Sequence, residues 1–112
     1  MMMLIKSALE RLGAWWHEDF RVVQEQGDTL PAVVRKNSLV HMVDAGKSWS
    51  VGFQCPCGCG EVIELLLLPE VEPHWSLTVD RLNRPTLSPS VWKATGCRSH
   101  FWMRGGRIVW AR

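Results

Sequence analysis

The fold of this chain is decided by the stretch Phe53-Gln54-Cys55-Pro56-Cys57-Gly58-Cys59-Gly60. Further along the chain lies a second stretch, Cys97-Arg98-Ser99-His100-Phe101-Trp102, and together the two contain all four cysteines of the protein. Zn²⁺ takes four sulfur or nitrogen ligands in a tetrahedron, usually from two close pairs carried by two turns. The two stretches therefore predict a zinc site that joins distant parts of the chain.

Five candidate ligands compete for the four positions of such a site. Cys55 and Cys59 have a suitable spacing for one pair, and Cys97 with His100 forms the second pair. Cys57 is then surplus. Either Cys57 is a ligand and Cys55 is a packed thiol, or one member of the cluster is a reactive thiolate beside a metal or beside His100.

Two other uses of the cysteines stay open. Four cysteines can form two disulfides in three connectivities, although nothing in the chain indicates an oxidising compartment. They can also be inert buried thiols, although three cysteines so close together and beside two glycines are poor core material. Reduced thiolates suit the cell interior, so we expect a cytoplasmic protein.

The length and composition predict a single domain over residues 1–112. A chain of 112 residues with 46% hydrophobic and 21% charged residues is globular and has room for one modest core. Residues 1–20 carry apolar side chains at helical spacing, which predicts a short N-terminal helix. Lys6, Glu10 and Arg11 interrupt its apolar face, so we expect neither a membrane span nor a secretory signal.

The remainder of the chain predicts a mainly β (α+β) fold, with a metal-binding β domain over residues 35–110. Residues 49–53 and 62–68 flank the cysteine loop as two strands, which is typical of a zinc-ribbon-like β-hairpin. Residues 62–68 are apolar on both faces, and this indicates a central strand. Gly105-Gly106 predicts a tight turn between strands at 100–104 and 107–110. Further strands are expected near residues 20–24, 38–43, 75–79 and 86–92.

Three motifs occur in order along the chain: C-x-C-G-C-G at residues 55–60, T-L-x-P-S-[IV] at residues 86–91, and C-x-S-H-[FY]-W-[IVLM] at residues 97–103. They resemble the motifs of a small family of bacterial and phage proteins that is classified as a domain of unknown function. Some members of that family are encoded beside ubiquitin-like conjugation genes. The resemblance implies a peptidase that removes ubiquitin-like proteins from their conjugates, with the ubiquitin-like protein or its conjugate as partner.

The resemblance also implies roles for individual residues. It gives the metal ligands as Cys57, Cys59, Cys97 and His100, with Cys55 as the fifth candidate. It gives Ser90 and Ser99 as the motif hydroxyls.

The catalytic candidates are Glu61 and Ser90. A hydrolytic zinc keeps one position open for water and needs a nearby base, for which Glu61 is the nearest carboxylate in sequence and His74 is a second choice. A site with four good ligands is instead closed and structural. Ser99 is next to His100 only in sequence, because adjacent residues on a strand point to opposite faces.

The last third of the chain offers a different function. It holds seven basic residues and no acidic one between Arg81 and Arg112, interleaved with Trp92, Trp102 and Trp110. In surfaces that bind nucleic acid, cations contact phosphates and indoles stack on bases.

Taken together, the metal site and the motifs lead us to expect a zinc-dependent hydrolase or peptidase acting on ubiquitin-like conjugates. The alternative is a zinc-stapled module that binds protein or nucleic acid without catalysis.

Overall fold

The computed structural model describes residues 19–111, in which nine β-strands and no helix occur. The strands are β1 (Arg21–Gln26), β2 (Ser38–Asp44), β3 (Lys47–Gln54), β4 (Val62–Leu66), β5 (Ser76–Val79), β6 (Pro85–Ser88), β7 (Val91–Trp92), β8 (His100–Arg104) and β9 (Arg107–Trp110). The prediction of a mainly β fold is confirmed. The helix expected over residues 1–20 falls almost entirely outside the described residues. Within residues 19–111, no helix is long and apolar enough to cross a membrane.

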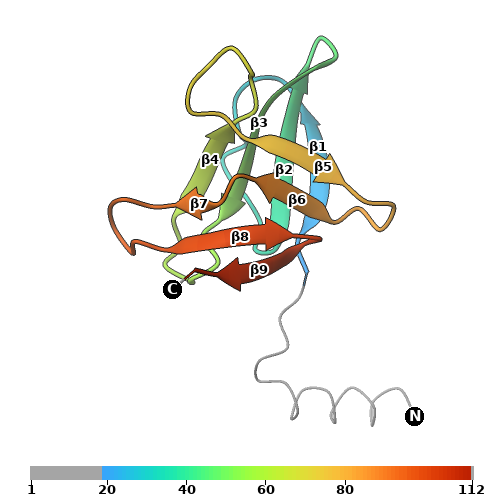
Figure 1. The fold of residues 1–112 in the computed structure, drawn as a ribbon. Coiled ribbons are helices and arrows are strands. Elements are labelled where there is room, and N and C mark those ends of the chain that lie inside the picture. Colours follow the sequence, from blue (N-terminus) through green and yellow to red (C-terminus); the bar gives the residue numbers. More distant parts are fainter. Residues whose placement is uncertain (1–18, 112) are drawn as a thin grey trace, which may run out of the picture.

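The strands form two layers (Figure 1). One layer is the sheet β1-β2-β3-β4, and the other contains the pair β5-β6 and the sheet β7-β8-β9. Strand β6 is tied to the β8–β9 turn, because Gly106 donates its amide to the Pro85 carbonyl and Gly105 donates its amide to Thr86 Oγ1, both at 2.8 Å. The two smaller sheets therefore act as one layer that covers the larger sheet.

The main core lies between the layers and is built from the alternate, inward-facing residues of the strands. Three phenylalanines run through it edge to face, with ring centroids 5.8 Å apart for Phe20 and Phe53 and 6.2 Å apart for Phe53 and Phe101. The buried residues of this core are Phe20, Leu39, Val51, Phe53, Cys55, Ile63, Leu65, Leu87, Val91, Phe101 and Met103. Cys55 belongs to the core, so the cysteine loop starts from the packed interior of the molecule.

A second, smaller core covers the other face of the large sheet. Strand β1 pairs with β2 in parallel, with Arg21 opposite Ser38, so the chain between them must return along the sheet. Its apolar side chains pack with those of the sheet in a cluster formed by Leu30, Val34, Val40, Met42 and Trp49. Gly52 leaves room for this return, because a Cβ atom there would lie only 2.5 Å from Leu30 Cδ1.

The hairpin around the cysteine loop forms as predicted, but its second strand is not central. Strands β3 and β4 pair antiparallel with Phe53 opposite Ile63. The prediction of a central strand at residues 62–68 is wrong, because β4 lies at the edge of its sheet. Only Ile63 and Leu65 of this strand are buried, whereas Val62 and Leu66 are exposed.

The C-terminal hairpin also forms as predicted. Strands β8 and β9 pair antiparallel, and Arg104 and Arg107 flank the turn. Gly105 and Gly106 have φ values of 55° and 80°, the left-handed conformation that a two-residue turn of the primed type requires. This hairpin carries the second cysteine stretch at its start.

Candidate functional site

Four cysteines from two distant stretches of the chain meet in one cluster. Cys55 directly follows β3, Cys57 and Cys59 come from the loop before β4, and Cys97 precedes β8. Their Sγ atoms all lie within 4.8 Å of one another. All four are free thiols, and only Cys55 is buried. The disulfide alternative is therefore not what the structure contains.

The cysteine cluster fits the donor set and the size of a tetrahedral metal site. A Zn²⁺ ion with Zn–S bonds of about 2.3 Å holds its sulfurs about 3.8 Å apart. The Sγ atom of Cys55 lies 3.4 Å from that of Cys57 and 3.6 Å from that of Cys97. A small movement of these sulfurs away from one another around an ion would bring the two distances to the expected value. The cluster is therefore compatible with a metal such as zinc.

Local contacts shift the pKa values of Cys97 and Cys55 in opposite directions. The pKa of Cys97 is lowered to about 6, first by a hydrogen bond from Ser99 Oγ, which lies 3.2 Å from the sulfur. Burial raises the pKa of Cys55 to about 12. Because thiolates are the ligand form, Cys97 is ready near neutral pH, whereas Cys55 gives up its proton when an ion takes its place.

His100 does not join the four cysteines. Ser99 contacts the cluster, with its Oγ atom 3.2 Å from Cys97 Sγ and 3.7 Å from Cys55 Sγ. His100 is the next residue, so its side chain points to the opposite face of the strand. There its Nε2 atom lies 3.0 Å from Ser90 Oγ. Of the five predicted ligands, the structure thus brings the four cysteines together and pairs the histidine with a predicted catalytic serine.

The Ser90–His100 pair is held by two neighbouring strands. Ser90 immediately precedes β7, and Trp92 of that strand lies directly opposite His100 of β8. Ser90 is two positions before Trp92, so both side chains share the solvent face of the layer. The carbonyl of Ser90 accepts a hydrogen bond of 3.2 Å from Trp75 Nε1, which anchors the residue on its other side. A hydroxyl at this distance from an imidazole has the arrangement of a nucleophile and its base.

A second serine–histidine pair lies on the other sheet. His41 Nε2 is 2.8 Å from Ser48 Oγ, and both residues line an open hollow of about 290 Å³ beside Trp75. Burial lowers the pKa of His41. This pair lies outside all three sequence motifs, and it therefore supplies a natural comparison for Ser90 and His100.

The other predicted bases are engaged elsewhere. Glu61 forms an ion pair with Lys93, and this contact connects the cysteine loop to the segment after β7. His74 Nδ1 lies 2.8 Å from Glu72 Oε1 and 2.9 Å from the Val71 carbonyl oxygen. Within residues 19–111, neither Glu61 nor His74 forms a hydrogen bond to the Ser90–His100 pair. Glu61 therefore links the β3–β4 loop to the segment after β7.

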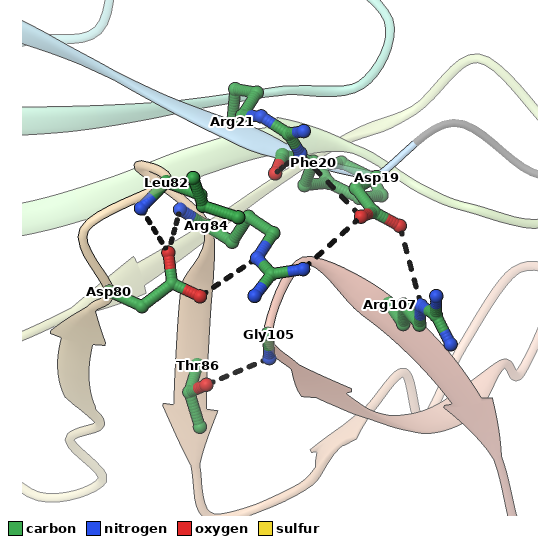
Figure 2. A network of polar contacts seen from close by, with 9 residues as sticks. All are labelled: Asp19, Phe20, Arg21, Asp80, Leu82, Arg84, Thr86, Gly105 and Arg107. Atoms are coloured by element: carbon green, nitrogen blue, oxygen red, sulfur yellow. Dashed lines mark hydrogen bonds and ion pairs between the residues drawn. The ribbon is translucent and has the colours of Figure 1, made fainter.

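Two arginines of the basic last third, Arg84 and Arg107, are paired with carboxylates (Figure 2). Asp19 lies 3.7 Å from Arg21, 3.9 Å from Arg84 and 3.6 Å from Arg107. Asp80 Oδ2 lies 2.8 Å from Arg84 Nε, and hydrogen bonds from the Arg84 amide and guanidinium lower the pKa of this carboxyl group. These cations hold the N-terminal end of β1 against the second layer. The pairing gives no support to a nucleic-acid surface.

The fold and the site define a small β protein in which a four-cysteine cluster and a serine–histidine pair lie on opposite sides of one strand. Residues 26–111 match the model of a family described as bacterial ubiquitination-like system serine protease (BubE). Since the match covers most of the chain, the protein belongs to this family. A comparison with curated proteins found no match, and neither did a comparison with solved structures.

Proposed function

We propose that the protein is a serine protease of a bacterial ubiquitination-like system, with Ser90 as the nucleophile and His100 as the general base. The observation that carries this proposal is the 3.0 Å contact between Ser90 Oγ and His100 Nε2. The family description supports the same chemistry, because it names a serine protease. The proposed substrate is a ubiquitin-like protein joined to another protein or extended at its C-terminus, and the proposed location is the cytoplasm.

The pair can perform acyl transfer in two steps. Ser90 Oγ attacks the carbonyl carbon of the scissile bond while its proton passes to His100 Nε2, and the leaving amine then takes that proton as the C–N bond breaks. A water molecule repeats the sequence on the acyl-enzyme and releases the carboxylate. The proton must sit on His100 Nδ1 before the attack, so that Nε2 is free to accept.

The proposed zinc has a structural role in this scheme. Cys55, Cys57, Cys59 and Cys97 would fill all four positions of a tetrahedral ion, which leaves no position for a reacting water. When bound, the ion supplies a cross-link between the β3–β4 loop and the start of β8. Glu61 supports the same junction through its ion pair with Lys93. We therefore assign neither to the chemical step.

Cleavage of a purified substrate tests the proposal. A ubiquitin-like protein from such a system, fused at its C-terminus to a reporter protein, is incubated with the wild type and with Ser90→Ala and His100→Gln variants. Each substitution should lower the cleavage rate by about 10³-fold or more, and the double variant should lose no more than the worse single variant, because the two residues act as a unit.

The second serine–histidine pair provides the matched controls. Ser48→Ala and His41→Gln remove the same groups at the same kind of contact, and both variants should cleave at the wild-type rate. Full activity of Ser90→Ala, or loss of activity only in the Ser48→Ala variant, would overturn the assignment of the nucleophile.

A further inference from the structure

The imidazole of His100 packs against two indole rings. The ring centroids of Trp92 and His100 are 5.5 Å apart with planes inclined by 23°, and those of His100 and Trp102 are 5.6 Å apart with planes inclined by 32°. Both indoles are therefore only moderately inclined to the imidazole and lie at ring-packing distance from it. The Arg104 guanidinium also lies over the Trp102 ring, 5.2 Å from its centroid.

The strand register produces this stack. Phe101 and Met103 are fully buried in the core, so His100 and Trp102 must share the outer face of β8. Lys93 donates its amide to the Ser99 carbonyl, and the His100 carbonyl accepts from Ala111 on the opposite side. Trp92 and His100 thus form a non-hydrogen-bonded cross-strand pair, the kind in which facing side chains come closest.

Serine proteases of the triad type hold their histidine with a carboxylate at Nδ1. In those enzymes a buried aspartate holds the imidazole in the correct orientation and stabilises the imidazolium that forms during the reaction. Within residues 19–111, no aspartate or glutamate forms a hydrogen bond or an ion pair with His100. Both tasks are therefore left to other groups around the ring.

We propose that Trp92 and Trp102 are positioning residues that perform these two tasks. Two flat rings packed against the imidazole restrict its rotation and keep its Nε2 edge directed at Ser90. The faces of the indoles also carry the negative part of the ring quadrupole, so they attract the cation that forms when His100 takes the serine proton during the attack. This inference rests on the proposed roles of Ser90 and His100. One such contact is typically worth about tenfold in rate.

A fluorophosphonate probe tests the proposal without knowledge of the natural substrate. The probe reacts with an activated serine. In this reaction an Oγ–P bond forms, the P–F bond breaks with loss of fluoride, and the serine proton passes to the base. Intact-mass spectrometry gives the maximal labelling rate, kinact, and the half-saturating probe concentration, Ki. Trp92→Leu and Trp102→Leu should each lower kinact about tenfold and leave Ki unchanged, because the loss concerns the base rather than probe binding.

Conservative and matched variants separate positioning from folding. Trp92→Phe and Trp102→Phe keep an aromatic face against His100 and should restore most of kinact. Trp110→Leu makes the same change on β9, where the indole contacts Phe101, and should leave kinact unchanged. Trp92 is 70% exposed, so its removal leaves no buried cavity.

Each outcome of the labelling experiment has one meaning. Absence of an adduct on Ser90 in the wild type would overturn both this inference and the proposed function. An adduct on Ser90 whose kinact is the same in the wild type and in both leucine variants would overturn the inference alone. A change confined to Ki would also overturn it, because the indoles would then act on the probe and not through His100.

Discussion

Removal of the proposed metal ion tests how the two layers are held together. An ion bound by the four cysteines would close a long loop, because Cys55 and Cys97 are 42 positions apart in the chain. Closing a segment of this length in the unfolded chain stabilises the native state by about 4 kcal/mol at 25 °C on the chain-entropy argument. A domain of ordinary stability has a free energy of unfolding of about 5–15 kcal/mol, so loss of the ion should remove a large part of it.

Urea unfolding followed by tryptophan fluorescence measures this loss. For a chain of this size the urea dependence is about 1–2 kcal/mol per molar, so the midpoint should fall by about 2–4 M after chelation. Cys97→Ser should lower the midpoint by a similar amount, and chelator should then have no further effect on that variant. If the metal is shown to leave and the free energy of unfolding falls by less than about 1 kcal/mol, the reasoning about the cross-link is refuted.

Three further substitutions probe the core, the acid stability and the role of the loop carboxylate. Phe101→Ala should lower the free energy of unfolding by about 3–5 kcal/mol in urea, and a loss below about 2 kcal/mol would contradict its place between the layers. The pKa of Asp80 is lowered from its ordinary value of 3.8, first by the hydrogen bond from the Arg84 amide. This contact stabilises the folded protein above pH 3.8, and the stabilisation is lost as the pH falls through the pKa that Asp80 has in the folded protein. Asp80→Asn should therefore show a flatter dependence of Tm on pH below 3.8, and an unchanged slope would count against the contact. Glu61→Gln breaks an exposed ion pair with Lys93 and should cost at most about 1 kcal/mol while the cleavage rate stays near wild type; a loss of cleavage would return Glu61 to the list of bases.

Patterns that depend on neighbouring residues were readable from the sequence. The spacing of Cys55, Cys57 and Cys59 beside two glycines predicted a sulfur cluster, and the structure brings these three thiols together with Cys97. Both hairpins that carry the cysteines also follow local rules, namely strand pattern and turn chemistry. The Gly105-Gly106 turn is the clearest case, because its positive φ values restrict the residues that can occupy it.

The side of the sheet on which a residue lies was not predicted correctly from the sequence. The C-x-x-H spacing favoured His100 as a ligand. In the structure Ser99 faces the cysteines, and because adjacent residues of an extended chain point to opposite faces, His100 points away from them. The apolar run at residues 62–68 suggested burial on both faces, but β4 is an edge strand whose outward residues Val62 and Leu66 remain exposed. Neither the facing side nor the strand order follows from composition alone, because both are set by partners distant in sequence.

Ser99 and His100, at the start of β8, point in opposite directions and contact different sites. Ser99 joins the cysteine cluster through Cys97, and its carbonyl accepts the Lys93 amide at 2.8 Å, so the cluster also sets the register between β7 and β8. That register determines where His100 lies relative to Ser90. A misplacement of about 1 Å between reacting groups can lower a rate about 100-fold, so a closed metal site would support catalysis by geometry while it remains outside the reaction. A metal-free protein that still folds should therefore bind substrate as before and turn it over more slowly.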